Sequence, residues 1–127
     1  MTLAGQTILV TGATGAIGQA ICTRLAGEGA RVVIHYGRNR AAAETLLARI
    51  GGGGTCLPAD LSDPAAATAL FAAAVQAEGR ITGLVNNAGI RSEVPVTADL
   101  DTWQAAWNHE MRVNFLAAVD LTRAAIL

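Results

Sequence analysis

A glycine-rich turn near the N-terminus constrains the fold of this chain more than any other feature. The turn, T-G-A-T-G-A-I-G at residues 11–18, lies between an apolar strand pattern and a helical pattern. In such a strand–turn–helix unit, glycines allow a tight turn, close approach of the backbone to a phosphate, and packing of the helix on the sheet. We assign these roles to Gly12, Gly15 and Gly18 in that order, with the Thr14 hydroxyl as an added donor. The pattern therefore predicts a dinucleotide site whose pyrophosphate faces the helix N-terminus.

Strand and helix patterns alternate along the rest of the chain. The predicted strands cover residues 7–11, 31–36, 55–59 and 81–86. The predicted helices cover residues 16–28, 40–50, 63–78 and 101–127, the last as one helix or a helix pair. This alternation predicts an α/β fold of the Rossmann type, in which a parallel sheet lies between two helix layers (αβα). We expect the strand order 3-2-1-4, which is the N-terminal half of that fold.

Three local signals mark where elements begin or end. Asp63 followed by Pro64 predicts an N-cap and first helical residue for the third helix. Asp101, with Gln104 three residues later, predicts a capping box at the start of the last helix. Pro58 cannot donate a ladder hydrogen bond, so we expect its strand to lie at the sheet edge or to end there.

Composition favours one domain with a well-buried sheet. Of the 127 residues, 52% are hydrophobic and 15% are charged, which suits strands that are buried on both faces. A net charge of −1, without a basic tract, argues against a nucleic-acid surface. No apolar run approaches the ~18 residues of a membrane span, and no targeting segment is visible. Cys22 and Cys56 predict buried free thiols in the cytoplasm and no metal site.

The residues that follow the second strand bear on the choice of cofactor. An NAD site usually carries an acidic residue ~20 positions beyond the glycine turn. Tyr36 occupies that place here, and Arg38 follows it. Arg38 offers charge-assisted bonds to a ribose 2′-phosphate, and Arg40 can add to them. The alternative is that Arg38 only solvates a loop, but a missing acid together with a present base favours NADP(H) over NAD(H).

Three further segments carry a resemblance to a known family. Asp60-Leu61 follows the third strand, N-N-A-G at residues 86–89 follows the fourth, and Trp107 precedes Asn114 with W-x6-N spacing. Together with the glycine turn, they resemble the short-chain dehydrogenase/reductase family, in the single-domain group that includes the 3-oxoacyl-[acyl-carrier-protein] reductases. Ala16 departs from that group, which has glycine there; the resulting turn resembles the family's extended, sugar-nucleotide-modifying group.

The resemblance implies roles for the matched residues. Asp60 would bond the adenine amino group, Leu61 would help seat the ring, Asn86 would tie the sheet together, and Asn114 would be catalytic, holding a water in a proton relay. The implied cofactor-binding set is Gly12, Thr14, Gly15, Ile17, Gly18, Tyr36, Arg38, Asp60, Leu61, Asn87, Ala88 and Gly89. The residues alone leave local alternatives open: Asp60 capping a turn, the Asn pair as turn residues, and Asn114 satisfying a backbone group.

The family's proton-transfer residues have no match in this sequence. Its catalytic Ser and Tyr-x-x-x-Lys pair follow the active-site Asn, whereas this chain ends at Leu127, has Tyr36 as its one tyrosine and contains no lysine. Two histidines do not replace that pair. His35 lies at a strand end near the adenosine side of the cofactor, and His109 lies on a helix face, where a lone histidine is usually structural. We therefore expect residues 1–127 to be an incomplete NAD(P)-binding Rossmann domain, truncated after the helix of the active-site Asn, and not a reductase alone.

These observations lead to one functional expectation and two alternatives. We expect the cofactor-binding N-terminal portion of an NADP(H)-dependent oxidoreductase that acts on a small-molecule carbonyl or alcohol. The first alternative is a non-catalytic nucleotide-binding or interaction protein built on a half-Rossmann unit. The second is a fragment of an extended-group epimerase, which the glycine turn alone suggests. We also expect a homo-oligomer, because the strand at residues 81–86 would form an open sheet edge.

Overall fold

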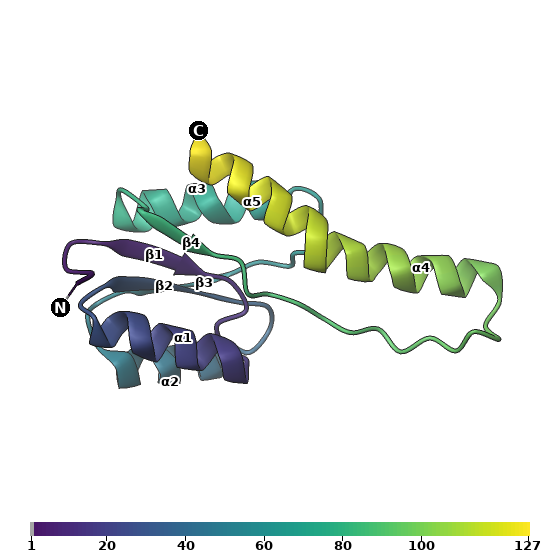
Figure 1. The fold of residues 1–127 in the computed structure, drawn as a ribbon, viewed down its shortest axis with the longest axis horizontal. Coiled ribbons are helices and arrows are strands. Elements are labelled where there is room, and N and C mark those ends of the chain that lie inside the picture. Colours follow the sequence, from purple (N-terminus) through teal and green to yellow (C-terminus); the bar gives the residue numbers. More distant parts are fainter. Residues whose placement is uncertain (1) are drawn as a thin grey trace.

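The computed structural model describes residues 2–127, which fold around a four-stranded parallel sheet (Figure 1). The strands are β1 (Thr7–Val10), β2 (Arg31–Tyr36), β3 (Thr55–Pro58) and β4 (Gly83–Val85). Their order is β3-β2-β1-β4, and all three pairings are parallel. In the central strand, Leu9 pairs with Val33 of β2 on one side and with Leu84 of β4 on the other. The predicted Rossmann-type fold and strand order are therefore confirmed.

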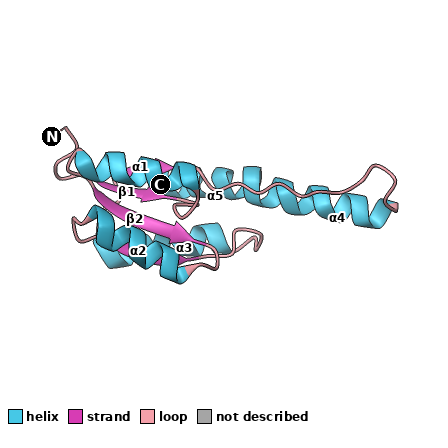
Figure 2. Ribbon diagram, turned by 90° about the horizontal axis from the view of Figure 1, so that it is seen from below, coloured by secondary structure: helices cyan, strands magenta, loops and turns pink. Residues whose placement is uncertain are grey.

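Helices cover both faces of this sheet. The first face carries α1 (Ala16–Gly27) and α2 (Arg40–Ile50), and the second carries α3 (Ala66–Glu78) and α5 (Ala117–Ile126) (Figure 1). A π-helical turn, η1 (Arg112–Leu116), joins α5 to the preceding α4 (Leu100–Met111). Figure 2 shows from below that α4 and the segment leading to it extend well beyond the sheet. The predicted last helix is thus two α-helices in line, with a wider turn between them.

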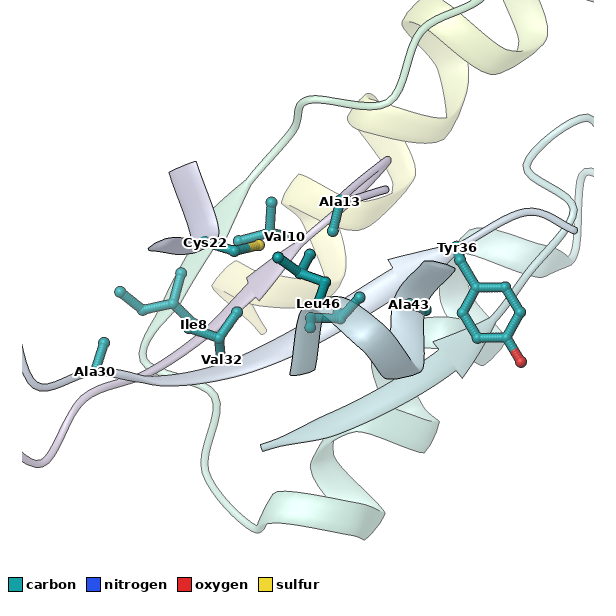
Figure 3. Close-up of a cluster of buried hydrophobic side chains, with 10 residues drawn as sticks. Ile8, Val10, Ala13, Cys22, Ala30, Val32, Tyr36, Ala43 and Leu46 are labelled. Atoms are coloured by element: carbon teal, nitrogen blue, oxygen red, sulfur yellow. The ribbon is translucent and has the colours of Figure 1, made fainter. Parts of the chain in front are cut away.

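The alternation of side chains along β2 divides the core in two. Val32, Ile34 and Tyr36 belong to a cluster on the α1–α2 side, shown in Figure 3, whereas Val33 belongs to a second cluster with residues of α3 and α5. Successive strand residues point to opposite faces, so an all-apolar strand supplies both clusters. Full burial of one such side chain contributes about 1.5–3 kcal/mol, and this burial fixes the sheet that positions the loops at its carboxyl end.

The start of α3 differs from the prediction. The helix begins at Ala66, and Asp63 with Pro64 forms a turn ahead of it. The Asp63 carboxylate accepts the N–H of Ala65 at 2.9 Å, and its carbonyl oxygen accepts the N–H of Ala66 at 3.0 Å. An Asp side chain readily bonds the backbone two residues ahead, and here this local turn replaces the expected N-cap.

The capping box predicted at Asp101 is also wrong. The N-cap of α4 is Asp99, whose carboxylate accepts the N–H of Thr102 at 2.8 Å and its hydroxyl at 2.8 Å. These hydrogen bonds lower the pKa of Asp99. Asp101 lies in the first turn, where its negative charge interacts favourably with the positive end of the helix dipole. Asp99, which the sequence analysis did not consider, takes the role because its backbone is extended.

Burial of the two thiols is unequal. Cys22 of α1 is fully buried in the cluster on the α1–α2 side of the sheet. This burial raises the pKa of its thiol to about 11. Cys56 is only half-buried, which corrects the prediction for that residue; both cysteines are free. Pro58 ends β3 at the sheet edge, as predicted. Within residues 2–127, no helix has the length and apolarity needed to cross a bilayer, and no group of three potential metal ligands occurs.

Candidate cofactor-binding site

The loops that follow the four strands surround a cleft at the carboxyl end of the sheet. One part, of about 440 Å³, is lined by the glycine turn and by the segment after β4. A second part, of about 390 Å³, is lined by the segments after β2 and β3 and by residues of α4 and η1. The two parts share Gly12, Ala88 and Gly89, so they form one continuous cleft. It lies where the strand order reverses direction, the position at which open α/β sheets bind ligands.

The three glycines of the turn are required for different reasons. Gly12 has φ +61°, and a Cβ there would lie 2.7 Å from the Cα of Ala88. A Cβ on Gly18 would lie 2.4 Å from the carbonyl oxygen of Gly12. A Cβ on Gly15, in contrast, would meet only that same oxygen, at 3.6 Å. Packing therefore explains Gly12 and Gly18, whereas the space beside Gly15 suits a ligand that approaches the backbone closely.

The N-terminus of α1 borders the same part of the cleft. Its N-cap, Gly15, has no side chain to accept a hydrogen bond from the first turn, and that turn contains no acidic residue. The free N–H groups and the positive end of the helix dipole together favour an anion there. Thr14 and Ile17 line the cleft, and Ile17 is 71% exposed although it is apolar. These features fit a pyrophosphate beside the turn and an apolar ligand surface against Ile17.

Thr11 joins the glycine turn to the segment after β4, and the sequence analysis did not include it among the site residues. Its buried hydroxyl accepts the N–H groups of Asn87 at 3.0 Å and Ala88 at 2.9 Å, and donates to the carbonyl of Val85 at 3.4 Å. The Asn87 amide donates to the carbonyls of Thr11 and Gly12, at 3.1 Å each. A polar residue that ends an apolar strand was the available signal for this role.

The other residues of the N-N-A-G segment also have structural partners. The amide of Asn86 donates to the Thr122 hydroxyl of α5 at 3.1 Å, so this residue ties β4 to a helix rather than to another strand. Ala88 and Gly89 line both parts of the cleft. Asn87 thus stabilises the glycine turn and also lines the first part of the cleft, whereas Asn86 anchors β4 to α5.

Asp60, Leu61 and Arg38, three residues predicted to bind the cofactor, line the second part of the cleft. The Asp60 carboxylate accepts the hydroxyl of Ser62 at 2.6 Å and its N–H at 3.0 Å, and these bonds lower the pKa of Asp60. Asp60 therefore stabilises a turn, its predicted local alternative, and also lines the cleft. Leu61 is buried in the second core cluster, and its exposed fraction of 5% leaves little beyond its backbone for contact with a ligand.

The structure does not bring the Tyr36 side chain to the cleft. Its ring is buried with Ala43 and Leu46 in the cluster under α2 (Figure 3). Only its backbone reaches towards β3, where the carbonyl accepts the N–H of Ala59 at 3.1 Å. Because neighbouring strand residues alternate, His35 faces the cleft in its place. His109 also lines the cleft, which differs from the purely structural role expected of it.

Asn114 lies in η1 and bonds the segment that follows β4. Its amide nitrogen donates to the carbonyl of Ile90, and its amide oxygen accepts the N–H of the same residue, both at 2.7 Å. This is the backbone-satisfying role that was the local alternative. Single π-helical turns occur often at functional sites, and this one places Asn114 beside Gly89, which lines the cleft.

A parallel sheet in this order, a helix without a side-chain N-cap after a glycine turn and a cleft at the strand-order reversal define a Rossmann-type unit. Comparison with known proteins identifies the family to which this unit belongs. Residues 6–127 match the family model described as short chain dehydrogenase. The chain therefore belongs to the short-chain dehydrogenase/reductase family, in agreement with the resemblance seen in its sequence.

Individual relatives agree with this assignment. The chain is 35% identical over 126 residues to an uncharacterized oxidoreductase of Methylorubrum extorquens, covering 97% of this chain and 50% of the relative. It is 36% identical over 107 residues to a 3-oxoacyl-[acyl-carrier-protein] reductase of Synechocystis, covering 81% and 43%. A short chain dehydrogenase from Burkholderia cenocepacia in complex with NADP superposes with a TM-score of 0.88 at 34% identity, covering 99% and 51%. The chain thus spans about half the length of the relatives it matches.

Proposed function

We propose that this chain is the cofactor-binding portion of an NADP(H)-dependent oxidoreductase that interconverts a carbonyl compound and an alcohol. The observation that carries the choice of cofactor is Arg38, an exposed cation beside Asp60 in the cleft, with no acidic residue at the end of β2. Arg38 forms no ion pair within residues 2–127, whereas Arg40 bonds Glu44 at 2.8 Å. Arg38 is therefore the guanidinium free to bind a 2′-phosphate.

Each part of the cleft has a role in this proposal. The backbone at Gly15 and the N-terminus of α1 bind the pyrophosphate, and Ala88 with Gly89 contacts the adenosine ribose. Asp60 and the Leu61 backbone bind the adenine. When bound, the cofactor would supply the hydride. Asn114 would hold a water of the proton relay at the reacting end. The space beside Gly15 and the uncapped helix support the first assignment, and the NADP complex of the Burkholderia cenocepacia relative supports the cofactor class.

Binding measurements on the purified chain test the cofactor assignment. Calorimetric titration should give tighter binding of NADP⁺ than of NAD⁺. Arg38→Ala should remove most of the difference, on the order of 1–3 kcal/mol for a lost charge-assisted phosphate contact. Arg40→Ala is the matched control and should change the preference far less, because its partner is Glu44. Equal affinities of the unmodified chain for both cofactors would contradict the assignment.

Substrate, location and assembly belong to the same proposal. The substrate is a small molecule with a carbonyl or hydroxyl group. A cytoplasmic location is supported by the free thiols of Cys22 and Cys56, which persist in a reducing compartment. A homo-oligomer is supported by the apolar side chains that α4, η1 and α5 leave exposed.

A further inference from the structure

The imidazole of His35 joins two segments that line the cleft. Its Nδ1 lies 2.9 Å from the backbone nitrogen of Gly12, and its Nε2 lies 3.0 Å from the carbonyl oxygen of Ala59. The Gly12 N–H can only donate, so Nδ1 must accept and carries no hydrogen. The Ala59 carbonyl can only accept, so Nε2 carries the hydrogen. Both contacts are therefore satisfied by a neutral ring in a single tautomer.

Both partners of His35 hold the geometry of the cleft. The carbonyl of Gly12 accepts the N–H of Gly15 at 3.3 Å and the amide of Asn87 at 3.1 Å, and it lies where Gly18 packs most closely. Movement of Gly12 would therefore change the phosphate side of the cleft. Ala59 directly precedes Asp60, on the adenine side. The ring of His35, which is 3% exposed, thus fixes the distance between the two sides.

We propose that His35 is a positioning residue for the cofactor, and that its protonation releases the glycine turn and weakens dinucleotide binding. A proton on Nδ1 would place two N–H donors against each other and break the bond to Gly12. The bond to Ala59 would remain, so the ring would stay in place while the turn loses its anchor. This inference rests on the proposed function, because it concerns the same cofactor site.

Surrounding groups favour the neutral ring at ordinary pH. Burial lowers the pKa of His35 from the usual value of 6.5, and the hydrogen bond to the Ala59 carbonyl opposes that change only in part. The segments that follow β1 and β3 present backbone groups to the ring. The other charged or titratable side chains that line the same part of the cleft are Arg38, Asp60 and His109. Arg38 and the ionised Asp60 carry opposite charges, so their effects on the protonation of the ring oppose each other, and burial is the main cause of the lowered pKa of His35. The ring therefore becomes charged only at a pH below the usual histidine value.

Two substitutions separate this role from simple packing. In His35→Asn, the amide oxygen takes the place of Nδ1, keeps an acceptor for Gly12 and does not titrate. In His35→Leu, a side chain of similar bulk offers no acceptor. Affinity for NADP⁺ is measured by calorimetry at about pH 8, on the basic side of the usual histidine value, and at an acidic pH where NMR titration shows the His35 ring of the free chain to be protonated. The 2′-phosphate itself titrates at about pH 6, but its contribution to the pH dependence of binding is the same for all three proteins.

The expected result is a difference between proteins in their loss of affinity on acidification. The unmodified chain should lose about three- to tenfold more affinity than His35→Asn, which is the size of one broken hydrogen bond. His35→Leu should bind weakly at both pH values. Equal acid sensitivity of the unmodified chain and His35→Asn would overturn the proposal, and that comparison stands even if His35→Leu fails to fold.

A measurement without cofactor keeps this inference distinct from the proposed function. If the unmodified chain fails to bind NADP⁺ or NAD⁺ even at about pH 8, on the basic side of the histidine value, the proposed function is wrong. NMR titration of the free chain then still tests His35. The Gly12 amide signal should shift with the same midpoint as the His35 ring nitrogens, and it should not titrate in His35→Asn. A Gly12 signal that is insensitive to the ring's titration would overturn the inference by itself.

Discussion

The side chain of Asn114 satisfies both backbone polar groups of Ile90, through two hydrogen bonds of 2.7 Å each. Ile90 belongs to the segment between β4 and α4, which contains no regular secondary structure in its first half. This pair therefore helps to hold a stretch of irregular backbone against η1, together with the bond from the Ser92 N–H to the Glu110 carboxylate of α4 at 2.8 Å.

Replacing Asn114 should loosen the Ile90 segment and leave the sheet intact. Asn114→Ala removes both bonds and should cost about 0.5–1.5 kcal/mol of unfolding free energy, since the site is exposed to water. Hydrogen exchange at the Ile90 amide should become faster, while exchange in β1 is unchanged. Asn114→Asp is the control, because its carboxylate still accepts the Ile90 N–H and should preserve part of the protection. Unchanged exchange at Ile90 in Asn114→Ala would show that the pair does not hold this segment.

Substitutions of the last two glycines of the turn, Gly15 and Gly18, should have separate effects on cofactor binding and on stability. Gly18→Ala places a Cβ 2.4 Å from the Gly12 carbonyl, so α1 must shift, and we expect a loss of about 1–3 kcal/mol in unfolding experiments. Gly15→Ala meets no atom closer than 3.6 Å, so it should melt like the unmodified chain. Its methyl group occupies the space assigned to the pyrophosphate and should weaken NADP⁺ binding. Full affinity in Gly15→Ala would remove the main support for that assignment.

A buried carboxylate should make stability depend on pH. The side chain of Glu78 is 3% exposed and bonds Arg31 of β2 and the hydroxyl of Thr55 of β3. Burial alone would raise the pKa of Glu78, but these donors outweigh it and lower the pKa below the usual 4.5. The ionised form is thus favoured by folding, so the stabilisation is complete above that value and is lost as the pH falls through the folded-state pKa.

Glu78→Gln tests this assignment. It keeps the shape of the side chain but removes its charge. The unfolding free energy near neutral pH should fall by about 1–2 kcal/mol, a value kept small because Arg31 is half-exposed and water screens the pair. Its stability should also vary less with pH in the acidic range. Glu44→Gln, which affects an exposed pair with Arg40, should leave the melting temperature unchanged. Equal destabilisation by the two substitutions would contradict the role given to burial.

The open edge of the sheet should promote self-association. Within residues 2–127, β4 pairs only with β1, and its other side presents unpaired backbone groups. Phe115 and Ile126, on the neighbouring helices, are 54% and 79% exposed. Light scattering should therefore show a mass that rises with concentration, and Phe115→Asp or Ile126→Asp should reduce it. A monodisperse 13.0 kDa species that melts cooperatively at high concentration would contradict this expectation.

Much of the fold could be predicted because its signals are local. The apolar run before the glycine turn, the spacing of the three glycines and the strand at residues 31–36 each depend on a few adjacent residues. Element boundaries were harder to predict: α4 is capped by Asp99, two residues before the predicted Asp101. In that case the backbone conformation chose the cap, and no propensity distinguishes two acids two positions apart.

The sequence by itself determined the family and the strand order, and it indicated Gly12, Gly15 and Arg38, which line the cleft. Only the tertiary structure decided that His35 faces this cleft while Tyr36 is buried on the opposite side. Strand β2 is apolar towards both helix layers, so its sequence does not show which residues face which layer. Thr11 and Asn87 stand 76 positions apart, and they become partners only when β1 and β4 lie side by side. Hydrogen bonds between such distant residues depend on the packing of the whole sheet, which no local pattern encodes.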